Sequence, residues 1–408
     1  MKLRFLAVAA IFGGLWAGGV AVHAAETDFI KIGVLTDMSG RYADSTGKGS
    51  VVAAQLAAED FGGKVLGKTI EIESADHLNK PDVGKAIAQQ WYDSDGVDLI
   101  VDVPTSSVAL AVQDVSRDRK KIVIFSSPGS SDITGAKCSP YSIHWTFDTY
   151  ALAQVTGGAV VKSGGNSWFF VTANDEYGHA LERDTAQIVK ANGGKVLGNA
   201  DVPLDAQDYS SVLLQARASN AKVIGLANAG ADTINAVKQA AEMGIAAGGQ
   251  KLAGLLVFIS DIHALGLQAA QGLELTEAFY WDQTDETRAW SKRFFGRIGS
   301  EPTSAQAGVY GAVAHYLKAV QAAGSTDSAK VMDKMRAIPI NDFMTKNGTL
   351  RLDGRVMRNM YLYEVKKPSE STGSWDDYKL VRTVPASEAF RPLDQGGCPL
   401  VTNGAPAR

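Results

Sequence analysis

The sequence predicts an α/β protein with doubly wound sheets, in which parallel strands are covered by helices on both faces. Three observations lead to this prediction. The chain has 408 residues, which at about 150 residues per domain is enough for two or three domains. Short apolar runs alternate with segments of helical periodicity, as is typical of parallel sheets. This alternation of strands and helices occurs once before and once after about residue 148, so we expect two similar lobes.

The first half of the series contains four predicted strands and three predicted helices. An Ala-rich helix ends at Gly62-Gly63, and Pro81 suits the first turn of the next helix. Val83, Ile87 and Trp91 then recur at the spacing of one helix face. The predicted strands are 29–35, 69–74, 97–103 and 121–125, and the predicted helices are 49–61, the segment from Pro81, and 106–118.

In the second half, predicted strands and helices continue to alternate up to about Tyr280. After Tyr280 this alternation ends. The predicted helices of the second half are 150–162, 176–191, 209–218 and 233–243, and its predicted strands are 167–171, 195–202, 221–226, 255–259 and 273–280. Three successive helices are predicted at 287–298, 305–322 and 328–338, followed by antiparallel strands at 350–352, 358–363 and 378–381.

Composition excludes several classes of protein. Hydrophobic residues make up 45% and charged residues 21% of the chain, which argues against wholesale disorder and against a multi-span membrane protein. The 40 Lys and Arg residues are balanced by 44 Asp and Glu residues. No basic stripe interrupts this even mixture, so nucleic acid is not an expected partner.

The N-terminal segment has the pattern of a secretory signal peptide. Lys2 and Arg4 precede an apolar run over 5–22, and residues 22–24 are small or tolerated at a cleavage site. Lys2 is followed by a single residue before Arg4, so the two form the positive segment at the start. An uncleaved membrane anchor is the alternative, but four glycines within the run weaken a spanning helix. We therefore expect residues 1–24 to be removed and the mature protein to be free in the periplasm.

Two cysteines in an exported chain suggest one disulfide. Cys138 lies in Lys-Cys-Ser-Pro and Cys398 in Gly-Cys-Pro, and both contexts are typical of loops. Two separate thiols are the alternative.

Signatures of catalysis and of metal binding are missing from the sequence. We find no phosphate-binding Gly-rich loop, no His-Glu-x-x-His, no Gly-x-Ser-x-Gly and no Cys-x-x-Cys. The six histidines are scattered, without a second ligand at metal spacing. We therefore expect no enzyme, no cofactor and no metal site, although catalytic triads need not be local in sequence.

Two successive strands end in hydroxyl-rich turns, and these are the most informative feature. The strand 97–103 leads into Pro104-Thr105-Ser106-Ser107, and the strand 121–125 leads into Ser126-Ser127-Pro128-Gly129-Ser130-Ser131. Ligands of doubly wound sheets bind beyond the carboxyl ends of the strands. Hydroxyls, free N–H groups and a helix N-terminus suit a carboxylate there. Simple N-capping by Ser and Thr is the alternative.

Three further residues follow strands of the second half. They are Tyr177, Asn228 and Asp261. Tyr177 fits a core or capping role equally well, and Asp261 fits either a helix cap or a partner for a ligand amine.

Several stretches together carry a resemblance to a known family. They are IKIGVLTDMSG at 30–40, AEDFGG at 58–63, the two Ser-rich turns, NDEYG at 174–178 and GLANAG at 225–230. In their order and spacing, the chain resembles the extracytoplasmic solute-binding proteins of branched-chain amino-acid-type ABC transporters, with the type I periplasmic binding protein fold. The resemblance covers roughly residues 28–385.

The resemblance implies two doubly wound lobes joined by three crossovers, with a ligand cleft between them. We expect the crossovers near residues 147, 278 and 343. Lobe one would then comprise 27–147 and 279–343, and lobe two 148–278 and 344–385. Residues 386–408 would form a C-terminal tail tied back by the disulfide.

The resemblance also implies ligand-binding residues. The family's α-carboxylate site falls on Ser106 and on Pro128, Gly129 and Ser130, and Ser107 lies in the same turn as Ser106. Tyr42 falls where the family often places an aromatic residue near the ligand, and Tyr177 falls on the tyrosine of lobe two that closes over it.

Asn228 and Asp261 occupy positions where amino-acid binders place groups that meet the ammonium. Leucine-type binders, however, often have an aromatic near Asn228 and a Glu near Asp261. The 145–148 crossover and the cysteine pair resemble a subgroup with members that take aromatic carboxylates. The expected ligand is therefore a small carboxylate, either an amino acid or an aromatic acid.

The function implied is capture of this carboxylate by hinge closure and its delivery to an ABC permease in the inner membrane. We expect the binding protein to be a monomer. A ligand-sensing receptor module of the same fold, without transport, is one alternative. An exported hydrolase is another, and it would need a nucleophile–base pair in the cleft.

Overall fold

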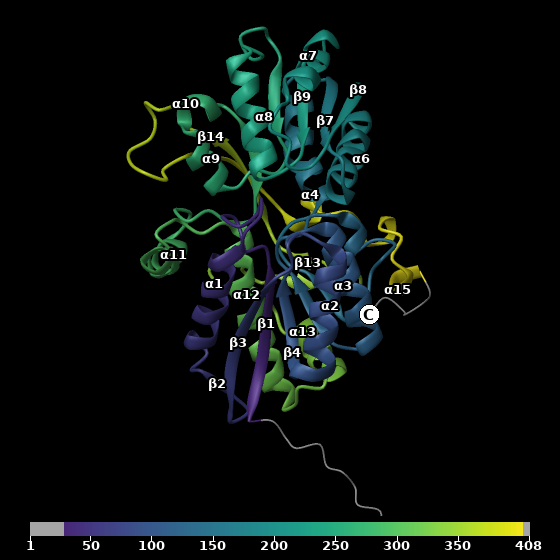
Figure 1. The fold of residues 1–408 in the computed structure, drawn as a ribbon, viewed down its shortest axis with the longest axis vertical. Coiled ribbons are helices and arrows are strands. Elements are labelled where there is room, and N and C mark those ends of the chain that lie inside the picture. The colour runs from purple at the N-terminus through teal and green to yellow at the C-terminus, as the bar shows by residue number, and fades with distance from the viewer. Residues whose placement is uncertain (1–27, 403–408) are drawn as a thin grey trace, which may run out of the picture.

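The protein has two lobes that lie one above the other along its long axis (Figure 1). This computed structural model describes residues 28–402, so the predicted signal peptide lies outside the described residues. Lobe one, below, is built around a six-stranded sheet, and lobe two, above, around a four-stranded sheet. The mixed α/β architecture with parallel sheets confirms the predicted fold class.

The sheet of lobe one has the strand order β2-β3-β1-β4-β5-β6, and only β2 is antiparallel to its neighbour. Apolar residues on both faces of β4 and β5 explain why helices must cover both sides. The strands are β1 (Phe29–Thr36), β2 (Lys64–Val65), β3 (Lys68–Asp76), β4 (Val97–Asp102), β5 (Ile122–Phe125) and β6 (Ser142–His144).

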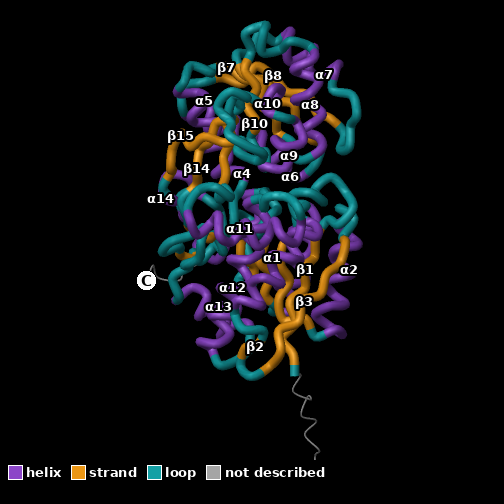
Figure 2. The backbone as a smooth tube through the Cα atoms, turned by 90° about the vertical axis from the view of Figure 1, so that its left-hand side faces the viewer, coloured by secondary structure: helices purple, strands orange, loops and turns teal. Residues whose placement is uncertain are grey.

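Alternate residues of these strands face two different helix layers. Val101 and Ile124 pack in one core cluster with residues of α1 and α12, whereas Ile100 and Val123 pack in another with residues of α2 and α3. The helices of lobe one are α1 (Gly47–Asp60), α2 (Pro81–Gln90), α3 (Ser106–Arg119), α11 (Asp285–Ile298), α12 (Ser304–Ala323) and α13 (Ser328–Ala337). A turned view of the backbone shows the same layers edge-on (Figure 2).

Lobe two repeats the design with a smaller parallel sheet of order β10-β9-β7-β8. Its strands are β7 (Ser167–Ala173), β8 (Lys195–Val202), β9 (Val223–Ala227) and β10 (Lys251–Gly254). Its helices are α4 (Thr149–Leu152), α5 (Gly158–Lys162), α6 (Glu176–Ala191), α7 (Ser210–Ala218), α8 (Ala231–Glu242), α9 (Ile259–Leu265) and α10 (Leu267–Ala270), and a π-helical stretch (Ala153–Gly157) joins α4 to α5.

The predicted strand at 255–259 is wrong. The strand is β10, which ends at Gly254, and the apolar residues that follow form a buried turn before α9 begins at Ile259. An apolar run alone does not distinguish a buried strand from a buried turn, and here Val257 packs in the core beside the third sheet while Leu256 and Phe258 pack in the cluster that runs through the hinge.

A third sheet lies beside lobe two and is antiparallel, with the order β11-β14-β15. Its strands are β11 (Glu274–Glu277), β14 (Met360–Val365) and β15 (Tyr378–Val384). The predicted strand 273–280 is thus shorter than expected and leaves the parallel series.

The chain passes between the lobes after β6, after β11 and before β14 (Figure 1). The third passage differs from the predicted crossover at 343. Strands β12 (Thr349–Leu350) and β13 (Val356–Met357) pair with each other, and Arg355 forms a bridge with His144 at the edge of lobe one. Residues 344–357 therefore lie with lobe one, because they extend the edge of its sheet.

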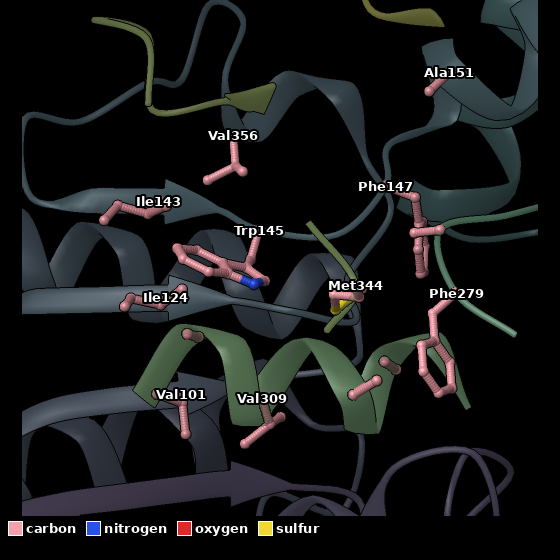
Figure 3. Packing of buried hydrophobic residues seen from close by; sticks show 14 of the residues in the cluster. Val101, Ile124, Ile143, Trp145, Phe147, Ala151, Phe279, Val309, Met344 and Val356 are labelled. Carbon is pink, nitrogen blue, oxygen red and sulfur yellow. The ribbon is translucent and has the colours of Figure 1, made fainter. Parts of the chain in front are cut away.

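Aromatic and aliphatic side chains fill the space where the passages meet (Figure 3). Trp145 lies between Ile143 and the helix that carries Val309, and Phe147 faces the segment that carries Phe279. Trp145 is fully buried and Phe147 nearly so. One continuous core cluster consequently runs from lobe one through the hinge into lobe two.

The predicted disulfide is present. Cys138 and Cys398 are bonded, with their Cα atoms 5.6 Å apart. Cys398 precedes α15 (Pro399–Thr402) and is reached through α14 (Ala386–Ala389) and a 3₁₀ turn (Leu393–Gln395), so the bond ties the described part of the C-terminal tail to lobe one.

Candidate ligand-binding site

The strand ends of lobe one are held together by one buried carboxylate. Asp102, at the end of β4, accepts hydrogen bonds from Thr36 Oγ1 at 2.7 Å, from Ser126 Oγ at 2.9 Å and from Ser127 Oγ. These donors join the ends of β1, β4 and β5. Burial raises the pKa of Asp102, and the three hydroxyl donors oppose that rise. The network thus fixes the edge from which the two Ser-rich turns begin.

The backbone at this edge is strained. Asp102 and Val103 have φ angles of 83° and 57°, a region that a β-branched residue such as Val rarely adopts. Each such residue costs about 1–3 kcal/mol and persists only where its surroundings enforce it. The strained turn leads directly into Pro104 and the N-terminus of α3.

Ser106 and Ser130 come together as predicted. The N–H of Ser130 donates to Ser106 Oγ at 3.1 Å. Ser106 is the first residue of α3, whose first-turn N–H groups have no partners within the helix. Since Ser106 Oγ already accepts a hydrogen bond, its O–H remains to be donated. Ser130 Oγ donates to Glu176 Oε1 of lobe two at 3.1 Å.

Tyr42 lies on a turn that Asp37 organises. Asp37 accepts hydrogen bonds from the N–H groups of Gly40 at 2.6 Å and Tyr42 at 3.0 Å. The carbonyl of Tyr42 in turn accepts from Ser45 Oγ at 3.1 Å and Thr46 Oγ1 at 2.8 Å. Tyr42 is thereby held at the cleft, and burial raises the pKa of its phenol above the ordinary value.

Lobe two meets this surface with Tyr177. Asp175 caps α6 by accepting the N–H of Gly178 at 2.8 Å, and Tyr177 is the second residue of the helix. Its ring lies against Gly129, where a methyl group would come within 2.5 Å of the ring. Burial raises the pKa of Tyr177, and its hydroxyl has no hydrogen-bond partner within residues 28–402.

These residues line a cavity between the lobes with about 330 Å³ of atom-free space, a volume that includes the solvent at its mouth. Lobe one contributes five hydroxyl-bearing side chains together with a proline and a glycine, and lobe two contributes one phenol and three apolar side chains. The lining residues are Tyr42, Ser45, Thr46, Pro104, Ser106, Ser127 and Gly129 from lobe one, and Tyr177, Ala229, Leu256 and Phe258 from lobe two.

Four predicted site residues line the cavity, namely Tyr42, Ser106, Gly129 and Tyr177. Sequence reasoning missed seven others. Pro104 and Ser127 belong to the two hydroxyl-rich turns from which the site was predicted, and Ser45 and Thr46 closely follow the predicted Tyr42. All four could therefore have been included from the sequence. Leu256 and Phe258 lie in the segment predicted as a strand, and Ala229 lies in the stretch 225–230 that carries the resemblance, next to the predicted Asn228.

Five other predicted residues do not line the cavity but are adjacent in sequence, or hydrogen-bonded, to residues that do: Ser107, Pro128, Ser130, Asn228 and Asp261. The carbonyl of Pro128 accepts His144 Nε2 at 2.7 Å, and Ser107 is half-buried on α3. Asn228 Oδ1 accepts Thr233 Oγ1 at 2.7 Å, while its Nδ2 has no partner in the described part of the chain. Asp261 accepts the N–H of Phe258 at 2.9 Å as a cap of α9, and burial raises its pKa to about 7.

The electrostatic character of the cavity follows from its lining. None of the lining residues is an Asp, Glu, Lys, Arg or His, so polarity comes from hydroxyls and from the N-terminus of α3. No group of three metal-binding side chains occurs among residues 28–402. Nor does any helix in this range have the length and apolarity needed to cross a membrane.

Comparisons with known proteins agree with this architecture. The family model of periplasmic binding proteins matches residues 30–373. A search of curated proteins gave no match. A periplasmic binding protein from Burkholderia mallei is 51% identical to this chain, with a TM-score of 0.90, and the alignment covers 91% of this chain and 99% of that one.

Two further solved structures extend the comparison. A branched-chain amino acid ABC transporter periplasmic ligand-binding protein from Burkholderia xenovorans is 41% identical, with a TM-score of 0.83, covering 91% of this chain and 99% of that one. A solute-binding protein from Rhodopseudomonas palustris, in complex with benzoate, shares the fold at 20% identity, with a TM-score of 0.77 and coverage of 87% and 96%. Given the two lobes, the cavity between them and the match over 30–373, the chain belongs to the periplasmic binding protein family.

Proposed function

We propose that this protein is the solute-binding component of an ABC importer and captures a small carboxylate, an amino acid or an aromatic acid, in the cavity between its lobes. The observation that carries the proposal is the pairing of free hydroxyl donors from opposite lobes. Ser106 and Tyr177 both line the cavity, and each retains an O–H to donate. Such donors suit a carboxylate, which accepts hydrogen bonds only.

The head group of the ligand binds lobe one in this proposal. Ser106 lies at the first turn of α3, where N–H groups without helical partners and the positive end of the helix dipole favour an anion. The hydroxyls of Ser45, Thr46 and Ser127 are already donated within lobe one. They therefore present oxygen acceptors and a fixed shape rather than further donors.

The body of the ligand contacts lobe two. Leu256, Phe258 and Ala229 supply an apolar wall, and Tyr177 adds a second ring. Because the lining holds no carboxylate to meet an ammonium, it favours an aromatic acid over an amino acid. Asp261, the predicted ammonium partner, uses its carboxylate to cap Phe258.

Binding is coupled to closure of the lobes. A ligand held on lobe one gains its contacts with Tyr177 and Phe258 only when lobe two closes, so it shifts the population toward the closed form. The partner that reads this form is an ABC permease, and the working compartment is the periplasm. The relative from Burkholderia xenovorans, a branched-chain amino acid ABC transporter periplasmic ligand-binding protein, supports the assignment to transport. We infer no catalytic step.

The test is calorimetry with benzoate, 4-hydroxybenzoate, leucine and phenylalanine on wild type and two neighbouring serine variants. Ser106→Ala removes a donor to a charged acceptor, and such hydrogen bonds contribute about 1.5–3 kcal/mol. We expect affinity to fall about 10- to 100-fold. Ser107→Ala, one residue along the same helix but outside the cavity lining, should leave affinity unchanged. Equal affinity of Ser106→Ala and wild type, or no binding of any carboxylate, would refute the proposal.

A further inference from the structure

Arg41, a residue of lobe one outside the cavity, reaches across the cleft into lobe two. Its Nη1 lies 3.2 Å from Asp232 Oδ2, and its Nη2 lies 2.8 Å from Asp205 Oδ2. Both carboxylates belong to lobe two, Asp232 on the first turn of α8 and Asp205 on the loop after β8. Neither Arg41 nor its partners line the cavity.

The pair between Arg41 and Asp232 is buried. The side chains are 8% and 3% exposed, whereas Asp205 is 65% exposed. The second oxygen of Asp232, Oδ1, has no hydrogen-bond partner in the described chain. Removing one member of such a pair leaves a buried charge without compensation, which costs far more than breaking a surface ion pair.

The backbones of the two lobes also approach each other closely beside this ion pair. Gly230 precedes α8 with a φ of 60°, and a methyl group there would lie 2.7 Å from the carbonyl oxygen of Arg41 and 3.3 Å from the ring of Tyr42. In sequence, Arg41 directly precedes Tyr42, which lines the cavity. In space, its backbone lies next to the turn that carries Ala229 and Gly230. The position of Arg41 is thus linked to lining residues of both lobes, Tyr42 and Ala229.

Another ion pair across the cleft is built differently. Arg183 of lobe two meets Asp132 of lobe one at 3.1 Å, but these side chains are 49% and 35% exposed. Exposed pairs contribute about 0–1 kcal/mol because water and salt screen them. Of these two pairs, the buried one should therefore distinguish the closed form from an open one more strongly.

We propose that Arg41 is a closure latch, a positioning residue whose ion pair with Asp232 exists only in the closed form and raises ligand affinity without contact to the ligand. This inference rests on the proposed function, in which binding requires closure. Opening separates the two charges and returns both to water. The pair thus lowers the free energy of the closed form alone, and its loss should speed ligand release rather than slow ligand capture.

The first test measures affinity and rates for Arg41→Met, Asp232→Asn and the double variant. The probe is whichever of benzoate, 4-hydroxybenzoate, leucine or phenylalanine binds wild type most tightly. We expect R41M to weaken binding about tenfold, equal to about 1.4 kcal/mol, through faster dissociation. The double variant should fall within twofold of R41M, because the partners act as a unit.

Arg117→Met is the matched control, since Arg117 pairs with Asp114 within α3 and both are exposed, at 46% and 60%. It should bind as wild type does. The latch is overturned if R41M binds within twofold of wild type, if only its association rate changes, or if the losses from the two single variants multiply in the double variant.

A second measurement separates failure of the latch from failure of the proposed function. In the ligand-free protein, Ser130→Cys and Glu176→Cys place thiols at a contact that spans the cleft. Their rate of disulfide trapping scales with the closed population even where that population is small. R41M should trap about tenfold more slowly than R117M in this background, whether or not any carboxylate binds. Equal trapping rates would overturn the latch on their own.

Discussion

The two walls of the cavity differ in chemistry and in how they are held. The wall from lobe one consists mainly of hydroxyl groups tied into networks centred on Asp102 and Tyr42. The wall from lobe two consists of Ala229, Leu256 and Phe258 with the single phenol of Tyr177. One lobe is therefore suited to a polar head group, and the other to an apolar body.

The difference between the walls also suggests the order in which they contact the ligand. The hydroxyl wall is fixed by hydrogen bonds within lobe one and by a strained turn at Asp102 and Val103, so it needs no partner lobe to take shape. The apolar wall includes the buried turn after β10, where the ring of Phe258 lies 5.9 Å from the ring of Phe147 at the first passage between the lobes. We expect ligands to bind the first wall and then recruit the second.

The largest effect should come from blocking the approach of the walls at Gly230. In Gly230→Ala, the added methyl would lie 2.7 Å from the backbone carbonyl of Arg41, and such a clash costs about 1–3 kcal/mol. We expect the ligand affinity measured by calorimetry to fall by up to about a hundredfold. Gly244→Ala is the matched control, because Gly244 has a φ of 65° but open space around its Cα.

Both glycine variants place an L-residue at positive φ, so both should lose stability in thermal unfolding, and Gly230→Ala should lose more because its ψ of −136° lies outside the left-handed α region. Only Gly230→Ala should lose ligand affinity. Equal affinities in the two variants would mean that the walls do not close at Gly230 when ligand binds.

A smaller effect should come from the ring on the apolar wall. Phe258→Leu keeps an apolar side chain but removes an aromatic face, and we expect affinity for benzoate to fall about tenfold. Phe279→Leu removes another buried ring, near the second passage and outside the cavity lining. It should destabilise the protein comparably in thermal unfolding and leave benzoate affinity unchanged. A larger loss in Phe279→Leu would indicate that hinge packing, not ring contact, sets affinity.

The two walls also differ in how well the sequence predicts them. The hydroxyl wall follows from local rules, because Ser-rich turns after two successive strands meet at one edge of a parallel sheet. That reasoning brought Ser106 and Ser130 together correctly. The apolar wall depends on tertiary packing, because Leu256 and Phe258 lie in a buried turn whose apolar run has the same sequence pattern as a buried strand.

The same limit explains two predicted residues that do not line the cavity. Asn228 directly follows β9 as predicted, whereas Asp261 lies on α9 because the strand expected before it is a turn. Their side chains bond to Thr233 and to the N–H of Phe258. Capping and ligand contact place similar demands on a polar residue, and sequence alone does not separate them. Arg41 and Asp232 were not predicted either, since 191 residues separate them in the chain.

The smallest effect on affinity, and a clear one on stability, should come from Asp261, which bonds to the N–H of Phe258 in the apolar wall. Burial raises its pKa from 3.8 to about 7, so the folded protein keeps a proton that the unfolded chain has lost between about pH 4 and 7. Higher pH in this window therefore favours unfolding, and the stability present below pH 4 is lost as pH rises through 7. In Asp261→Asn, the amide oxygen still accepts the N–H of Phe258, but no proton is exchanged. The melting temperature of the variant relative to wild type should rise by a few degrees from pH 5 to pH 8, with benzoate affinity unchanged at pH 5. A constant difference across this range would show that Asp261 is already ionised at pH 5, and would return it to consideration as a partner for a ligand ammonium.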